Sequence, residues 1–355
     1  MARATERRRT VRLSGQSRSA RPDSLAAEEP LEIRINGAAL TVSMRTPGHD
    51  FDLVAGFLVA EGLVAGLDQL RALRYCAGAD DEGGNSYNVI DASLPHRAAA
   101  PATLHRNLLT SSACGICGRE TIEAIRTRVP YDLRADGLRV SPDTLYGLPD
   151  RLRAEQAVFE ATGGLHAAGL FTSDGRLLCL REDVGRHNAV DKVIGWALRE
   201  ELLPLRGHVL MVSGRASFEL TQKAAMAGIP LLAAVSAPSS LAVDLAEELG
   251  LTLIGFLRNR SANVYTGAER ITEPTPAPLE GEPAAVGEPH GGEPHGGEPH
   301  GGEPYGGEAG PDSAMATRAR RVGPSAETVS VASSANTSSS QPPAALLPPA
   351  ASTAR

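Results

Sequence analysis

The sequence predicts an α/β protein: a β-rich N-terminal subdomain is followed by an αβα domain, with a disordered segment at each end. Two observations carry this prediction. From residue 208 onward, short continuous apolar runs alternate with amphipathic runs, which is typical of a parallel sheet covered by helices on both faces. In much of residues 28–110, apolar and polar residues alternate with the two-residue period of half-buried strands.

Composition and pattern divide the 355 residues into five parts. Residues 1–27 are rich in Arg and Ser and have little to bury, so we expect a disordered basic arm. Residues 28–110 are the β-rich N-terminal subdomain, residues 111–141 a Cys-x-x-Cys loop with a helix, and residues 142–272 the α/β domain. In residues 273–355 a Gly-Glu-Pro-His-Gly unit repeats and a Ser-, Ala- and Pro-rich stretch follows, which predicts a disordered tail.

A β-hairpin is predicted at the start of the β-rich subdomain. Alternating runs over 31–35 and 40–44 flank the pair Asn36-Gly37. Asn-Gly between two alternating runs is a strong hairpin signal, because both residues tolerate the positive φ angles of a tight turn. Further predictions for this subdomain are a helix over 51–61 and strands over 70–75 and 87–90.

Strands and helices are predicted to alternate in the α/β domain. Strands are expected over 176–180, 208–212, 230–235 and 252–256, and helices over 142–155, 189–202 and 219–227, with another ending at Leu249. Asn188 is a candidate N-cap for the second of these helices, because its side chain can accept hydrogen bonds from free N–H groups. Glu219 and Lys223, four residues apart, are expected to form a surface ion pair.

Charge and composition exclude several classes of function. The formal net charge of −7 gives no reason to expect nucleic-acid binding by the whole chain. No apolar run approaches the roughly 18 residues of a membrane helix, and no apolar segment follows the arginines at positions 7–9, as a secretory signal would require. Four cysteines in a chain of this length do not make a disulfide framework. We therefore expect a cytoplasmic protein that binds neither nucleic acid nor membranes.

Cys114 and Cys117 form a Cys-x-x-Cys pair with a glycine after each cysteine. Such a pair can be half of a zinc site, a redox dithiol or a persulfide carrier. A structural zinc site needs four ligands, and Cys76 and Cys179 are isolated in the sequence, so no permanently bound metal is expected. A thioredoxin-type pair would follow an early strand, whereas this pair follows a polar stretch. The glycines suit the mobility of a carrier, and the helix start after Gly118 favours a thiolate.

Polar residues gather where the predicted parallel strands end. Ser213-Gly214-Arg215, Ser236 and Arg258-Asn259-Arg260 each follow an apolar strand. The carboxyl ends of parallel strands share one edge of a sheet, and ligands bind at that edge. Glycine, hydroxyl and guanidinium groups together suit an anionic ligand such as a phosphate. Arg215 precedes a helix at such a strand end, so we expect it to face the ligand.

Two histidines leave alternatives open. His187, with Arg186 and Asp183 beside it, either lines this site or supports a helix start. His166, which follows Gly163-Gly164, either faces the site or is a structural histidine.

Four motifs occur in order along the chain and together resemble one known family, the FdhD family of sulfur carrier proteins needed for formate dehydrogenase activity. They are Ser112-Ala113-Cys114-Gly115-Ile116-Cys117-Gly118, Thr162-Gly163-Gly164-Leu165-His166, Glu182-Asp183-Val184-Gly185-Arg186-His187-Asn188-Ala189-Val190-Asp191-Lys192, and Ser213-Gly214-Arg215. The resemblance covers about residues 28–271 and leaves out the basic arm and the repeat tail.

The resemblance implies that the chain accepts sulfur from a cysteine desulfurase as a cysteine persulfide. It would pass this sulfur to the molybdenum cofactor, bis-molybdopterin guanine dinucleotide, before the cofactor is inserted into formate dehydrogenase. The family places the persulfide on Cys114 with Cys117 assisting, although the helix start alone would favour Cys117. The cofactor-binding segment would be Phe256, Leu257, Arg258, Asn259, Arg260 and Ser261, to which we add Arg215 and His187.

The same resemblance implies a cytidine-deaminase-like fold for the second domain and a homodimer. The chain would act as a sulfurtransferase-type carrier, either catalytically or by stoichiometric delivery. The alternative is an accessory chaperone that binds the guanine nucleotide moiety of the cofactor and has a structural or redox Cys-x-x-Cys pair. Deamination is not expected, because His166-Ala167-Ala168 lacks the glutamate of the zinc deaminase motif.

Overall fold

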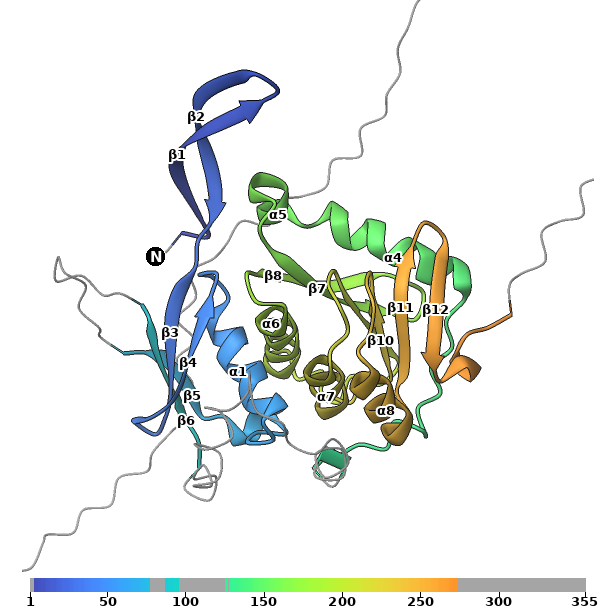
Figure 1. Ribbon diagram of the computed structural model, residues 1–355. Coiled ribbons are helices and arrows are strands. Elements are labelled where there is room, and N and C mark those ends of the chain that lie inside the picture. Colours follow the sequence, from blue (N-terminus) through green and yellow to red (C-terminus); the bar gives the residue numbers. More distant parts are fainter. Residues whose placement is uncertain (1–2, 77–86, 96–124, 127, 274–355) are drawn as a thin grey trace, which may run out of the picture. The chain divides into compact units, whose positions relative to one another are not determined.

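Three β-sheets and their flanking helices form the described part of the computed structural model, residues 3–76, 87–95, 125–126 and 128–273 (Figure 1). These residues belong to one compact unit, residues 1–282. The α/β prediction, with a β-rich N-terminal subdomain, is confirmed. The Cys-x-x-Cys pair and the predicted tail lie outside the described residues.

The N-terminal sheet has the strand order β4-β3-β6-β5. Its strands are β3 (Glu29–Ile35), β4 (Ala38–Arg45), β5 (Ala72–Tyr75) and β6 (Val89–Ser93). Strands β3 and β4 form the predicted hairpin, and Asn36 and Gly37 have φ angles of 49° and 84°. The buried side chains of β3 share one core with helix α1 (Asp50–Ala60), which confirms the helix predicted over 51–61.

The large sheet has the strand order β12-β11-β10-β9-β7-β8. Its strands are β7 (His166–Thr172), β8 (Leu177–Asp183), β9 (His208–Val212), β10 (Leu231–Ala234), β11 (Thr252–Arg258) and β12 (Ser261–Thr266). Strands β9, β10 and β11 are parallel, as predicted. Strands β7, β8 and β12 are antiparallel to their neighbours, so the sheet as a whole is mixed. The sequence did not indicate β12 because its residues are mostly exposed and polar.

Helices cover both faces of the large sheet. Helices α6 (Arg186–Arg199), α7 (Phe218–Met226) and α8 (Ser240–Leu249) pack on one face and α4 (Pro142–Ala154) on the other, followed by the short α5 (Ala157–Thr162). Along β9, Leu210 and Val212 join the core with α6–α8, while Val209 and Met211 join the core with α4. A strand buried on both faces is a continuous apolar run, which made β9 predictable. Short 3-10 helices span Leu67–Gln69 and Ala268–Arg270.

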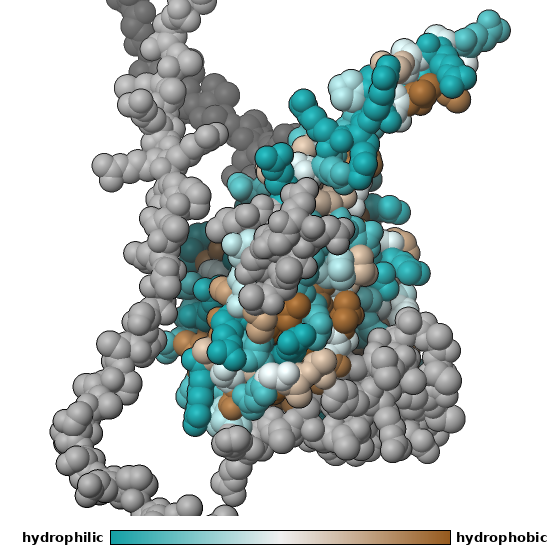
Figure 2. All heavy atoms as spheres, turned by 90° about the vertical axis from the view of Figure 1, so that its left-hand side faces the viewer, coloured by the Kyte–Doolittle hydropathy of each residue, from teal (hydrophilic) through white to brown (hydrophobic). Residues whose placement is uncertain are grey.

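The expectation of a disordered basic arm is wrong for residues 5–26. Strands β1 (Thr5–Ser14) and β2 (Ser17–Ala26) pair along their whole length in an antiparallel hairpin. Its residues are nearly all exposed and its surface is mostly hydrophilic (Figure 2). Burial therefore gave no sequence signal, and the hairpin is defined by its antiparallel register, which places Arg8 opposite Asp23, and by a turn at Gly15 with φ of 55°.

Helices α1 and α6 cross at two glycines and join the N-terminal subdomain to the α/β domain (Figure 1). A Cβ atom on Gly56 would lie 1.8 Å from the carbonyl oxygen of Asp191, and one on Gly195 would lie 1.8 Å from the carbonyl oxygen of Asp52. Both distances are far below van der Waals contact. The two glycines therefore set the separation of the helix backbones.

We expect Gly56→Ala to destabilise the protein by about 3 kcal/mol, because the added methyl group must push two helix backbones apart. The matched control is Gly147→Ala in α4, where a Cβ would meet only the Arg151 side chain at 3.7 Å. That control should stabilise the protein by about 0.5 kcal/mol through helix propensity. Urea unfolding of both variants checks the prediction, and equal effects at the two positions would contradict it.

Candidate functional site

The carboxyl ends of β9, β10 and β11 lie side by side, as the sequence predicted. The backbone N–H of Ser236 donates to the carbonyl of Gly214 at 3.3 Å, and that of Phe256 donates to the carbonyl of Ser236 at 3.2 Å. The Ser213-Gly214-Arg215 turn, Ser236 and the turn after β11 are thereby held at one edge of the sheet. Arg215 is exposed there.

Residues 256–261, called the 256–261 turn below, comprise the end of β11, the two-residue turn at Asn259 and Arg260, and the first residue of β12. Phe256, Asn259 and Arg260 have φ angles of 53°, 51° and 54°, a region that non-glycine residues rarely adopt. Strain of this kind persists only where the surrounding structure enforces it, and it occurs often at ligand-binding segments.

The side chains of this turn differ in their access to a ligand. Arg258, Asn259, Arg260 and Ser261 are exposed, whereas Leu257 is fully buried in the core with α4. Leu257 could therefore contact a ligand only through its backbone. The Arg258 guanidinium lies 5.8 Å from the centre of the Phe256 ring.

Arg260 already has partners on α4. It pairs with Asp143 at 2.6 Å and lies 5.3 Å from the centre of the Tyr146 ring. The side chains of Arg260 and Asp143 are 73% and 67% exposed, and an ion pair that exposed is worth little. A phosphate could displace Asp143 at small cost.

The segment from Glu182 to Lys192 contains several buried polar interactions. The Glu182 carboxylate accepts hydrogen bonds from the first N–H groups of α5, at 3.0 Å from Val158 and 2.7 Å from Phe159. Asp183 is fully buried and pairs with Lys192 at 2.7 Å. It also accepts hydrogen bonds from the backbone N–H groups of Gly185 at 2.8 Å and Thr46 at 3.1 Å.

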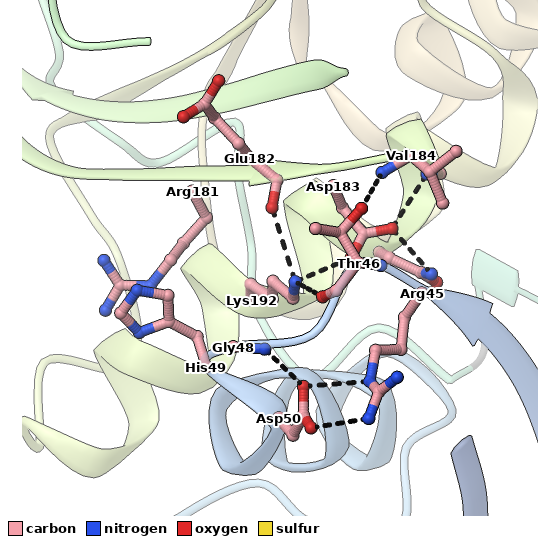
Figure 3. Close-up of polar contacts among 12 residues, drawn as sticks. Arg45, Thr46, Gly48, His49, Asp50, Arg181, Glu182, Asp183, Val184 and Lys192 are labelled. Atoms are coloured by element: carbon pink, nitrogen blue, oxygen red, sulfur yellow. Dashed lines mark hydrogen bonds and ion pairs between the residues drawn. The ribbon is translucent and has the colours of Figure 1, made fainter. Parts of the chain in front are cut away.

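These contacts lock two loops from different subdomains together (Figure 3). The Lys192 ammonium donates to the Thr46 carbonyl at 2.9 Å, and the Thr46 hydroxyl accepts from the N–H of Val184 at 3.2 Å. At the two ends of this β4–α1 loop, buried Arg45 of β4 pairs with Asp50 of α1 at 3.0 Å. The start of α6 is therefore held against the N-terminal subdomain by charge-assisted hydrogen bonds.

The sequence did not indicate these buried pairs. The available signal was the charged dipeptide Asp191-Lys192 inside an otherwise apolar helical run, since charged residues are almost never buried unless they are paired.

The start of α6 differs from the prediction. The helix begins at Arg186 with Gly185 as N-cap and has no side-chain cap. The sequence predicted Asn188 as the N-cap, and this prediction is wrong. Asn188 lies in the first turn of the helix. Its side chain donates to the Met44 carbonyl at 2.8 Å and to Asp183 at 3.1 Å, so these contacts tie it to the β4 edge and the preceding loop.

The two histidines lie close to the Gly214 turn. His187 pairs with Glu219 at 3.0 Å and lies 3.3 Å from the Ser217 hydroxyl, so it joins α6 to the start of α7. The hydrogen bond from His187 lowers the pKa of Glu219. Burial lowers the pKa of His166, and the neighbouring Arg186 and His187 lower it further. The neutral form of His166 is thereby favoured.

The surface pair predicted between Glu219 and Lys223 is wrong. Lys223 instead pairs with buried Asp191 of α6 at 2.8 Å, while Glu219 binds His187. Burial raises the pKa of Asp191 to about 6, although Lys223 acts in the opposite direction. Helices α6 and α7 are thus joined by a buried ion pair as well as by apolar contacts.

We expect Lys223→Met to destabilise the protein by about 3 kcal/mol near neutral pH, because it leaves a buried carboxylate unpaired. Loss of the ammonium raises the pKa of Asp191 further. The free energy of unfolding should therefore be highest at acidic pH, where Asp191 is protonated, and fall as pH rises through this pKa. Urea unfolding across the acidic to neutral range measures this slope.

The matched control is the double variant Asp191→Leu, Lys223→Met, which replaces the pair by apolar side chains. It should be close to the parent in stability and should lack the extra slope. If the stability of the single variant Lys223→Met did not depend on pH, the assignment of the buried pair between Lys223 and Asp191 would be contradicted.

The described residues contain no group of three or more His, Cys, Asp or Glu side chains placed to hold a metal ion. Their helices are also too short or too polar for any of them to cross a membrane. Open hollows of about 540 and 560 Å³ lie near residues 206–207 and 250–251, at the amino ends of β9 and β11. They face away from the polar edge described above.

The fold and the edge define a two-part α/β protein whose large sheet presents arginines at the carboxyl ends of its parallel strands. Residues 26–272 match the FdhD/NarQ family. The chain belongs to this family, and the resemblance inferred from the motifs is confirmed.

Close relatives match this chain over nearly the whole of their own length. The chain is 59% identical over 273 residues to a Streptomyces coelicolor protein named sulfur carrier protein FdhD, covering 76% of this chain and 97% of that protein. It is 53% identical over 276 residues to the Mycobacterium tuberculosis protein of the same name, covering 77% of this chain and all of that protein.

A solved structure supports the fold. The crystal structure of a formate dehydrogenase accessory protein from Desulfotalea psychrophila superposes with a TM-score of 0.60 at 24% identity, covering 76% of this chain and all of that one.

Proposed function

We propose that this chain is a sulfur carrier that accepts sulfur from a cysteine desulfurase as a persulfide on Cys114. It passes the sulfur to bis-molybdopterin guanine dinucleotide before that cofactor is inserted into formate dehydrogenase. The observation that carries the proposal is the arginine-bearing sheet edge, found in a chain that also has a Cys-x-x-Cys pair and is 59% identical to a protein named sulfur carrier protein FdhD.

The two thiols suffice for loading and release. In loading, the Cys114 thiolate attacks the outer sulfur of the desulfurase persulfide, and the desulfurase cysteine leaves as a thiolate. In release, the Cys117 thiolate attacks the inner sulfur of the Cys114 persulfide. A disulfide forms, and the outer sulfur leaves as sulfide and becomes a ligand of the cofactor metal. The two cysteines are oxidised as the sulfur is reduced, and a cellular thiol reductant restores them.

The turn of residues 256–261 would hold the guanine nucleotide end of the cofactor, together with Arg215 and His187. Guanidinium groups bind phosphate oxygens in a bidentate fashion, and Arg258 and Arg260 are both exposed at the turn. A cytoplasmic location fits this role, because a reducing compartment keeps the two thiols available. The chain would act there as a homodimer.

The alternative is an accessory chaperone that binds the guanine nucleotide and has a structural or redox Cys-x-x-Cys pair. The exposed arginine edge alone is compatible with it. The two functions differ in whether sulfur is carried.

Incubation with a cysteine desulfurase and cysteine should add the mass of one sulfur atom to the protein, and a reductant should remove it. Cys114→Ala should abolish this adduct. The matched control is Cys179→Ala, which should retain it, because burial raises the pKa of the Cys179 thiol to about 12 and the thiolate is the attacking form. Intact-mass spectrometry of the variants is the measurement. An adduct that is still present at the parent level in Cys114→Ala would contradict the carrier function.

Arg258→Ala together with Arg260→Ala should weaken binding of a guanine nucleotide by about tenfold or more, because charge-assisted hydrogen bonds to phosphate are lost. Persulfide formation should remain at the parent level. The control is Arg176→Ala, an exposed arginine in the β7–β8 turn. Isothermal titration with GDP makes the comparison, and unchanged affinity in the double variant would place the nucleotide elsewhere.

A further inference from the structure

We propose that the exposed hairpin of β1 and β2 docks on an acidic surface of the protein that receives the cofactor from this chain. The inference rests on the proposed function, because that function requires a receiving protein, the apo form of formate dehydrogenase. It adds the surface, and the chemistry of that surface, through which the two proteins meet.

The hairpin is strongly basic in a chain whose formal net charge is −7. Residues 5–26 contain six arginines, no lysine and only two acidic residues. Arg8 forms an ion pair with Glu6 at 2.6 Å. The other five arginines form no ion pair with any residue that the structure describes. Their charges are therefore available to a partner.

The pairing of the two strands separates the hairpin into two different faces. Side chains alternate between the faces of a strand, and directly paired residues share a face. One face, called the arginine face below, carries arginines around an apolar centre, whereas both acidic residues lie on the opposite face. The residues of the arginine face used here are Arg7, Arg9, Val11, Leu13, Arg18 and Ala20.

The apolar centre of the arginine face is open to water. The side chain of Leu13 is 73% exposed and that of Val11 is 46% exposed, and every residue from 11 to 23 is exposed. A two-stranded hairpin without a covered apolar face is at best marginally stable in water. Arginine and apolar side chains together are typical of the energetically important centre of a protein interface. The hairpin is therefore suited to being covered by another protein.

The residue types favour an acidic protein over a membrane or a nucleic acid. The hairpin contains no aromatic residue, whereas proteins that bind single-stranded nucleic acids stack bases on aromatic rings. Segments that lie on membranes bury a broad apolar face, and the arginine face has only two large apolar side chains. Guanidinium groups pair with carboxylates through two parallel hydrogen bonds. The matching surface therefore carries carboxylates around an apolar spot.

The base of the hairpin lies at the edge that the proposed cofactor site occupies. A Cβ atom on Gly164 would lie 3.5 Å from the Ala26 side chain at the end of β2, and one on Gly214 would lie 3.4 Å from His166 Nδ1. Gly164 directly precedes the start of β7 and Gly214 follows β9. Because β7 and β9 are antiparallel, these two points lie at the same end of the sheet. A protein that takes the cofactor from this edge meets the hairpin there.

The test measures binding of purified apo-formate dehydrogenase to the full chain by biolayer interferometry. Affinity should fall by about tenfold or more in the triple variant Arg7→Glu, Arg9→Glu, Arg18→Glu, which reverses the charge of the arginine face. The matched control is Arg8→Glu, Arg12→Glu, Arg21→Glu, which makes the same change of net charge on the opposite face. Its affinity should stay within about threefold of the parent.

A further variant, Leu13→Ser, keeps every charge and changes a side chain that is 73% exposed, so it leaves the fold intact. It should lower the affinity about fivefold or more, because the apolar contact with the partner is lost. Equal losses in the two triple variants would overturn the proposal, as would parent-level affinity in the first of them or no binding of the apoenzyme to the parent. Binding of phosphatidylserine vesicles or a DNA duplex through the same arginines, without binding of the apoenzyme, would also overturn it.

Persulfide loading of Cys114 and binding of GDP are measured on the same proteins. Both should stay at the parent level in every hairpin variant, which also shows that the variants are folded. Loading without hairpin-dependent binding of the apoenzyme refutes only the docking surface. Hairpin-dependent binding without loading refutes only the carrier function.

Discussion

The buried pair of Asp183 and Lys192 is the interaction on which the arrangement of the candidate site depends. Both side chains are removed from water, so each charge is tolerated only because the other is present and because backbone groups satisfy the remaining hydrogen bonds. Asp183 binds the N–H groups of Thr46 and Gly185, and Lys192 binds the Thr46 carbonyl. One ion pair thus fixes the loop after β4 and the loop before α6.

Further buried charges lie beside the helix crossing next to this pair. Gly56 and Gly195 bring the backbones of α1 and α6 into contact, and apolar side chains of both helices share one core. Asp52 on α1 is 2% exposed and binds both Arg181 and Arg199. The interface between the subdomains is therefore held by directional polar contacts as well as by a shared apolar core, and satisfied polar networks specify one arrangement of the elements.

Local sequence signals predicted those elements whose residues are buried or whose turn is chemically specific. Asn36-Gly37 predicted the β3–β4 hairpin because the turn requires positive φ, and β9 was predictable because it is apolar on both faces. The β1–β2 hairpin and β12 were missed, since exposed strands have no apolar period. The pairing of Lys223 with Asp191 was missed for another reason: it joins residues 32 positions apart, whereas the local rule paired Lys223 with Glu219.

The candidate site was predictable as a strand edge but not as a set of contacts. Strand order alone brought Arg215, Ser236 and the 256–261 turn together, because parallel strands end at one edge. The tie between His187 and Glu219 depends on how α6 packs against α7, and the burial of Leu257 depends on how α4 packs on the sheet. No local pattern encodes either.

The most direct test follows sulfur from its entry at Cys114 to a ligand bound at the arginine edge. Isotopically labelled cysteine, a desulfurase and the guanine dinucleotide form of the cofactor allow the label to be followed through both steps. With the parent chain, label should appear on the protein and then on the cofactor. When Arg258 and Arg260 are replaced by alanine, label should stay on the protein. Transfer to the cofactor at the parent rate by the Cys114→Ala protein would rule out this route.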